Sequence, residues 1–286
     1  MPAPQEGEST EATGCLRERG GRECGTAGLD GDSCALGTLR EMTSSSGSCR
    51  WETCGILLAM TGFHAALVDW RGTLVHITPP SSVVRQALQS LGRGPDARIV
   101  DMTLARLRAE LESPASIAAE RVIDSSTTVH RTLSLDMFDR AGIDDELAVA
   151  LYEAEWDPAS RPVYPDAVAT LAALKAGGVK TAIVSDIHFD IRPECHERQM
   201  GRYVDAYVLS CEQGFQKPDP RMFALALDAL GMEGSEALMI GDTPHTDGGA
   251  AEMGIATLIL PRPEDFGPRG LDIVPSLFGL SPGNPH

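Results

Sequence analysis

The sequence contains no long hydrophobic run, few aromatic residues and few positive charges. No apolar segment approaches the ~18 residues that a membrane-spanning helix needs. Residues 1–11 have neither the basic nor the apolar stretch of a secretory signal. Lys and Arg number 24 against 41 Asp and Glu, and the resulting net charge of -17 disfavours binding to nucleic-acid phosphates or to an anionic membrane. We therefore expect a cytoplasmic protein that has neither a nucleic acid nor a membrane as its partner.

The cysteines lack the close pairs that hold metals or form disulfides in small domains. Five of the seven lie within the first 54 residues, and none belongs to a Cys-x-x-Cys pair. A zinc or disulfide site there would need closer pairing. We therefore interpret these cysteines as free thiols in a loose segment.

Residues 1–60 differ in composition from the remainder of the chain. Gly, Ser, Thr, Glu and Cys dominate, and no period of 2 or 3.6 residues persists. Such a segment cannot bury enough apolar surface to offset the entropy lost on ordering. We expect a disordered N-terminal extension, and because Met60 stands just before the first predicted strand, we expect the functional chain to begin there.

Beyond residue 63, apolar runs typical of buried strands alternate with helical patterns. Helices are expected over 165–177 and 219–231, and residues 82–157 are expected to be mainly helical. The expected strands cover residues 65–68, 179–184, 207–209, 237–240 and 255–260. Strands that alternate with helices predict an α/β fold, a parallel sheet with helices on both faces. The helical block after the first strand is then an insertion into this fold.

Polar residues cluster in four segments that end or follow these strands, where open α/β sheets collect their chemistry. The segments are residues 69–74, 183–186, 217–220 and 240–247. Asp69 is a carboxylate that can attack phosphorus and form a covalent intermediate. Asp69 and Asp242 offer the hard oxygen ligands that Mg²⁺ prefers, and Asp247 is either a further ligand or the group that orients a bound water.

The same segments supply groups that can hold a phosphate. Ser185 offers a hydroxyl donor and Asp186 a backbone N–H. Lys217 brings a compact positive charge for a phosphate oxygen, which also damps repulsion between that phosphate and Asp69. Gly72 permits a sharp turn after the nucleophile. These residue types together predict phosphoryl transfer, with a small phosphorylated molecule as substrate and Mg²⁺ as cofactor.

Taken in order, the four segments resemble the motifs of the haloacid dehalogenase-like hydrolase superfamily over about residues 63–260. The resemblance implies a Rossmann-like core made of residues 61–79 and 164–286. It also implies that residues 80–163 form a mobile helical cap over the active site. Its motif positions map onto the nucleophile Asp69, the threonine Thr73, the phosphate-binding Ser185, the lysine Lys217 and the metal-binding acids Asp242 and Asp247.

Arg71 departs from the phosphatase pattern. In the phosphatases of the superfamily, the second residue after the nucleophile is an acid that protonates the leaving alkoxide and later deprotonates water. Arginine cannot take this role because its pKa exceeds ~12. The backbone carbonyl at this position is a metal ligand in the family, and that ligand survives any change of side chain. Arg71 is therefore retained both as a catalytic candidate and as a metal-binding position.

Three interpretations of Arg71 follow. The first, which we favour, is a hydrolase of reduced activity whose acid/base role is lost, relocated or unnecessary, as with an acyl phosphate whose leaving charge Arg71 stabilises. The second is a 2-haloacid dehalogenase in which Asp69 attacks carbon, although such enzymes work without metal and Asp242 and Asp247 argue against it. The third is a weak or inactive phosphate-binding or regulatory protein. No residue pattern predicts an oligomeric state.

Several other polar residues have simpler explanations than catalysis. Asp219 is expected to cap the helix that follows Lys217, and Asp247 offers a second interpretation as the cap of a helix near residue 248. Lone histidines in polar loops are usually solvated. We expect solvent exposure for His188, His196 and His245.

Overall fold

The computed structural model describes residues 62–263 and 266–280, so the expectations for residues 1–60 and their cysteines lie outside the described residues. Within those residues, five parallel strands form one sheet in the order β3-β2-β1-β4-β5. The strands are β1 (Ala65–Val68), β2 (Lys180–Ser185), β3 (Ala206–Leu209), β4 (Ala237–Gly241) and β5 (Ala256–Ile259). This confirms the predicted α/β, Rossmann-like fold.

Strand β1 occupies the centre of the sheet and is buried on both faces. Its side chains alternate, so that Ala66 and Val68 enter one hydrophobic core and Ala65 and Leu67 enter the other. Small and β-branched residues suit a strand that is covered from both sides. Because β2 and β4 flank β1 in parallel, the residue that follows β1 emerges between the ends of two neighbouring strands. That residue is Asp69.

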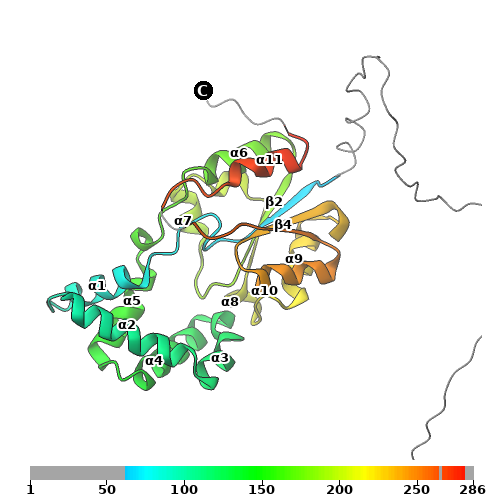
Figure 1. Cartoon of the computed structure of the whole chain (residues 1–286). Helices are drawn as coiled ribbons and strands as arrows, with labels where there is room; N and C mark the ends of the chain where they lie inside the picture. The colour runs from blue at the N-terminus through cyan, green and yellow to red at the C-terminus, as the bar shows by residue number, and fades with distance from the viewer. Residues whose placement is uncertain (1–61, 264–265, 281–286) are drawn as a thin grey trace, which may run out of the picture. The chain divides into compact units, whose positions relative to one another are not determined.

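Helices cover both faces of the sheet (Figure 1). Helix α6 (Ala167–Ala176) packs on one face together with α11 (Val274–Leu277), and α9 (Pro220–Leu230) packs on the other. Asp219 caps α9 as predicted, because its side chain accepts a hydrogen bond from the backbone N–H of Arg221. The remaining helices of this part are α7 (Arg192–Glu197), α8 (Ser210–Gln213), α10 (Pro244–Asp247) and the 3₁₀ turns η4 (Gly201–Tyr203), η5 (Gly234–Glu236), η6 (Gly248–Met253) and η7 (Leu271–Ile273).

The insertion between β1 and β2 is helical, as the sequence pattern predicts. Its helices α2, α3, α4 and α5 each begin after an Asp or Ser whose side chain accepts a backbone N–H. The insertion has a hydrophobic core of its own, whose buried residues come mainly from its first, second and last α-helices. The helices are α1 (Pro80–Ser90), α2 (Ala97–Leu111), α3 (Pro114–Glu120), η2 (Ile123–Ser125), α4 (Thr127–Arg140), α5 (Asp145–Trp156) and η3 (Pro158–Ser160). None of the helices in the described ranges is both long and apolar enough to cross a membrane.

The segment after β5 returns to the loop that follows β1. Asp166 anchors it by accepting three backbone N–H groups from residues 269–271, each at 2.8 Å. The buried guanidinium of Arg269 donates to the carbonyl oxygens of Gly72 at 2.5 Å, Pro261 at 2.6 Å and Leu260 at 2.8 Å. The C-terminal segment therefore braces the turn directly behind Asp69.

Candidate active site

Asp69 lies at the carboxyl end of β1 and is 6 % exposed. Lys217 Nζ donates to Asp69 Oδ1 at 2.8 Å and to Asp247 Oδ1 at 2.6 Å. Thr73 Oγ1 donates to the second carboxylate oxygen of Asp69 at 3.1 Å. Both oxygens of Asp69 are thus oriented by neighbours from different segments, and four of the predicted site residues meet at one point.

The electrostatics of this group reflect burial among like and unlike charges. Burial raises the pKa of Asp69 above its ordinary value of 3.8, and Lys217 opposes that rise. Burial alone would lower the pKa of Lys217, but the carboxylates of Asp69, Asp247 and Asp186 outweigh it and raise that pKa. The lysine is therefore a permanent cation placed between two carboxylates.

Asp242 and Asp247 follow β4 and complete a cluster of three carboxylates. One oxygen from each of Asp69, Asp242 and Asp247 lies within 4.8 Å of the others. Asp247 is 1 % exposed, and its Oδ2 accepts the backbone N–H groups of Asp242 at 3.0 Å and Thr243 at 2.9 Å. Its side chain caps no helix near residue 248, so that interpretation is wrong. Three converging hard oxygens fit a Mg²⁺ ion.

Gly72 permits the close approach of Asp242. Its φ is +86°, and a Cβ added there would lie 2.2 Å from Asp242 Oδ2. Any side chain at this position would therefore need a strained backbone and would displace a carboxylate of the cluster. The glycine is required both for the turn after Asp69 and for the position of the acid that faces it.

Ser185 and Asp186 lie at the end of β2. Ser185 is 1 % exposed, and its Oγ has no hydrogen-bond partner among the described residues. A buried, unpaired hydroxyl carries a desolvation cost that a bound anion would remove. Asp186 Oδ1 accepts the backbone N–H of Lys217 at 2.8 Å, and burial raises the pKa of Asp186 to about 7. Asp186 thus positions Lys217 as well as lining the site.

Arg71 does not present a free cation to the site. Its Nη1 donates to Glu155 Oε1 at 2.8 Å, and Glu155 belongs to the last turn of α5 in the insertion. Burial would lower the pKa of Arg71, but Glu155 outweighs burial and raises it. The departure from the phosphatase motif is therefore matched by an acid 84 positions away.

A cleft of about 1090 Å³ opens at this end of the sheet. Its walls come from the strand ends and from the insertion. The insertion contributes residues 117 and 120–125, and the strand ends contribute Asp69, Asp186, Lys217, Asp242 and Asp247. A small molecule in the cleft would contact both parts of the chain.

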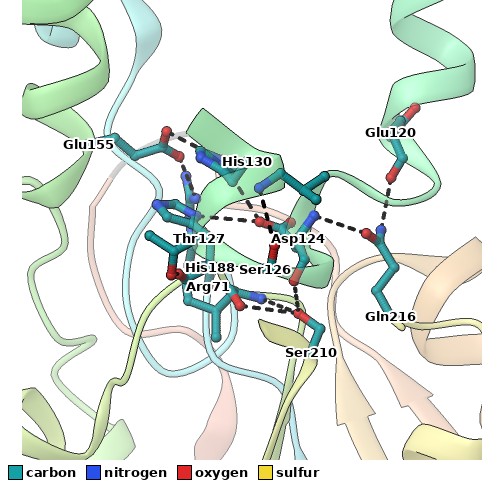
Figure 2. Close-up of polar contacts among 12 residues, drawn as sticks. Arg71, Glu120, Asp124, Ser126, Thr127, His130, Glu155, His188, Ser210 and Gln216 are labelled. Atoms are coloured by element: carbon teal, nitrogen blue, oxygen red, sulfur yellow. Dashed lines mark hydrogen bonds and ion pairs between the residues drawn. The ribbon is translucent and has the colours of Figure 1, made fainter. Parts of the chain in front are cut away.

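The structure corrects the expectation for one histidine. His188 is fully buried, and its ring stacks on that of His130 with centroids 3.4 Å apart and an interplanar angle of 10°. His196 and His245 are exposed, as expected. No sequence signal pointed to the residues around His188, because they come from the insertion and lie more than 30 positions away. They are Asp124, His130 and Glu155 (Figure 2).

Comparison with known families and relatives bears on these observations. A hydrolase family described as haloacid dehalogenase-like hydrolase matches residues 63–254. A phosphoserine phosphatase from Thermus thermophilus is 34% identical over 136 residues, which cover 46% of this chain and 55% of the relative. The (S)-2-haloacid dehalogenase 1 from Pseudomonas sp. is 31% identical over 130 residues, which cover 45% of this chain and 54% of the relative. The matched regions thus span about half the length of these relatives.

Solved structures agree on the fold. A phosphatase of the same superfamily from Thermococcus onnurineus superposes with a TM-score of 0.52 at 22% identity, covering 77% of this chain and all of the other. At this level of identity the likeness concerns the arrangement of strands and helices. It shows that the fold of this chain is a known architecture.

Proposed function

This chain belongs to the haloacid dehalogenase-like hydrolases, and from that premise we propose that it is a Mg²⁺-dependent phosphatase-type hydrolase with an altered acid/base step. Its substrate is a small phosphorylated molecule. The observation that carries the proposal is the buried Asp69, held by Lys217 and Thr73 beside two further carboxylates. Phosphatases acting on phosphoserine and phosphoglycolate among its relatives support the same class of substrate.

In the proposed reaction, a carboxylate oxygen of Asp69 attacks the phosphorus of the substrate. An aspartyl-phosphate forms as the bond from phosphorus to the leaving oxygen breaks, and the leaving group departs with the electron pair. Lys217 neutralises charge on the phosphoryl oxygens, while Ser185 Oγ and the backbone N–H of Asp186 grip the phosphate. Water then attacks phosphorus, releases phosphate and regenerates Asp69.

Mg²⁺ fits this site because hard oxygens converge without enough cations to balance them. Asp69, Asp242 and Asp247 would hold the ion, together with the backbone carbonyl of Arg71. When bound, the ion supplies positive charge that offsets repulsion between the phosphate and the carboxylates. Lys217 shares its charge between Asp69 and Asp247, and Arg262 Nε donates to Asp242 Oδ2 at 2.5 Å, so two cations face three carboxylates.

Arg71 limits which substrates react well. It cannot protonate a leaving alkoxide, so substrates with poor leaving groups should react slowly. Acyl and aryl phosphates need little protonation and should be preferred. Water attack on the aspartyl-phosphate also lacks the usual base, so we expect the covalent intermediate to persist longer than in an ordinary phosphatase.

We further propose that residues 80–163 act as a cap that closes over the cleft and selects the substrate. The cleft is lined on one side by the insertion, and Arg71 is already paired with Glu155 from that insertion. A cap that closes over a site excludes water and bulky molecules. A small metabolite is therefore a better candidate than a phosphorylated protein.

A dehalogenase relative supports one alternative, hydrolysis of a 2-haloacid. There Asp69 would attack carbon and halide would leave without a proton, so Arg71 would be no handicap. Asp242 and the buried Asp247, which would hold a metal ion beside Asp69, are unnecessary for that reaction. A non-catalytic phosphate-binding role is the second alternative, since Arg71 removes the acid/base group.

One set of assays separates these functions. The purified full chain is offered acetyl phosphate, p-nitrophenyl phosphate and 2-chloropropionate, with Mg²⁺ or with EDTA. The proposal requires Mg²⁺-dependent phosphate release that Asp69→Asn abolishes. Halide release that survives EDTA would establish the dehalogenase instead. Binding of phosphate and Mg²⁺ without any turnover would leave only the non-catalytic role.

A further inference from the structure

A second polar cluster lies where the insertion meets the loop after β2 (Figure 2). Asp124 comes from η2, His130 from α4 and Glu155 from the end of α5, while His188 follows β2. The proposed phosphoryl transfer uses none of these four side chains. The backbone of Asp124 is already tied to the strand end, since Ser210 Oγ donates to its carbonyl oxygen at 2.7 Å.

Asp124, His130 and His188 have the spacing of metal ligands, since one ligand atom from each lies within 4.8 Å of the others, and Glu155 reaches this group of three through His130. His188 Nδ1 lies 3.4 Å from Asp124 Oδ1, and His130 Nε2 lies 3.8 Å from the same oxygen. His130 Nε2 is also 3.8 Å from Glu155 Oε2. With bonds of about 2.1 Å, a tetrahedral Zn²⁺ ion keeps its ligand atoms about 3.4 Å apart. Both 3.8 Å contacts are too long for hydrogen bonds and would close by a few tenths of an ångström on a metal.

Burial leaves the imidazoles ready to bind. His130 is 5 % exposed, and neither of its ring nitrogens makes a hydrogen bond within the described residues. An unpaired buried ring aimed at two carboxylates is otherwise an unfavourable arrangement.

Arg71 has a place in this arrangement. It binds Oε1 of Glu155, and this leaves Oε2 directed toward His130. Groups that hold a metal ligand from behind fix its orientation and commonly contribute to affinity. Arg71 is in that case a positioning residue for Glu155.

We propose that Asp124, His130 and His188, with Glu155 as fourth ligand, form a transition-metal site of the Zn²⁺ class. Two imidazole nitrogens and two carboxylate oxygens suit Zn²⁺, whereas Mg²⁺ and Ca²⁺ favour oxygen ligands alone. The two rings are stacked nearly parallel with centroids 3.4 Å apart, so one ring would turn for both to bind a single ion. Because three ligands come from the insertion and one from the strand end, the ion fastens the insertion over the cleft.

The test is a titration of the full chain with Co²⁺, whose visible bands report tetrahedral coordination. Asp242→Asn removes binding at the carboxylate cluster, and one tetrahedral equivalent is expected to remain in that variant. In the Asp242→Asn background, His130→Gln and His188→Gln are each expected to weaken the affinity for the remaining Co²⁺ ion by more than about 100-fold. This exceeds the 10–100-fold that a residue behind a metal ligand contributes. The exposed His196→Gln is the matched control and leaves it unchanged. Arg71→Gln weakens it by at least about tenfold.

Asp124→Asn provides a second test. Its side chain is 23% exposed, so the substitution disturbs the fold less than a change of a buried histidine. Circular dichroism confirms that each variant is folded. Unchanged Co²⁺ binding in folded His130→Gln or Asp124→Asn would overturn the proposal. So would thiolate charge-transfer bands, which would assign the ion to cysteines. The site is expected to survive Asp69→Asn, so its failure and that of the proposed hydrolase are distinguishable.

Discussion

Replacing Arg71 by the missing acid is expected to raise turnover of ordinary phosphate esters. The change Arg71→Asp alone would set a new carboxylate beside Glu155, whose Oε1 lies 2.8 Å from the guanidinium in the native chain. The change is therefore made together with Glu155→Gln, which removes the repulsion and keeps a hydrogen-bonding side chain of similar size. The matched control is Arg71→Asn with Glu155→Gln, which removes the arginine without adding an acid.

The magnitudes favour a measurable gain. The side chains of Arg71 and Glu155 are 32% and 29% exposed, so solvent screens their ion pair and its loss destabilises the fold by about 1 kcal/mol. General acid–base catalysis contributes about 10²–10⁴-fold in rate. That factor corresponds to roughly 3–5 kcal/mol of activation free energy. A domain of ordinary stability tolerates the loss of about 1 kcal/mol in unfolding free energy. The double variant therefore stays folded, and the gain in rate can be measured.

The assay compares kcat/KM for an alkyl phosphate and for p-nitrophenyl phosphate with Mg²⁺ present. The gain over the control variant should be larger for the alkyl phosphate, because its leaving group depends more on protonation. Thermal unfolding checks that both double variants are folded. Equal rates for the folded acid variant and its control on the alkyl phosphate would refute the assignment of the altered step to Arg71.

Three further perturbations test the rest of the site and its support. Gly72→Ala should weaken Mg²⁺ binding, measured by calorimetry, because its Cβ would lie 2.2 Å from Asp242 Oδ2. The control for backbone strain alone is Gly142→Ala, since Gly142 has a φ of +69° and open space around it. Lys217→Met should abolish turnover and lower the unfolding free energy by about 3–5 kcal/mol, since two buried carboxylates lose their cation. Added Mg²⁺ should recover part of that loss of stability in a thermal melt. A melting temperature insensitive to Mg²⁺ would contradict the metal assignment. Asp166→Ala should cost at least about 2 kcal/mol in urea unfolding through the loss of three hydrogen bonds to a carboxylate, and a cost below 0.5 kcal/mol, the size of an ordinary surface substitution, would contradict its anchoring role.

The sheet and its motifs could be predicted because their signals are local. The run that became β1 is continuously apolar and is followed at once by Asp69, so both the strand and the acid at its end could be predicted within a few residues. The same holds for Asp242, which follows the apolar run of β4. Parallel strands bring their carboxyl ends to one edge of the sheet, and this is why such separated residues converge.

The cluster around His188 could not be predicted because its signal is not local. His188 follows β2 in a polar loop, which favoured a solvated side chain, yet tertiary contacts bury it against His130, 58 positions earlier in the chain. The partner of Arg71 is still more distant, 84 positions along the chain. No spacing within the insertion distinguishes these residues from others on its helices. Only the packing of the insertion against the strand ends does so.

The contact between Arg269 and Gly72 bears on how the protein can be shortened. The family match ends at residue 254, and a fragment trimmed to that limit would retain every motif residue from Asp69 to Asp247. It would lose strand β5 and the guanidinium of Arg269, which donates to the carbonyl oxygen of Gly72. We expect such a fragment to be catalytically impaired while its motifs are complete, so a terminal deletion or tag must respect a boundary near residue 280 rather than the one that the family match suggests.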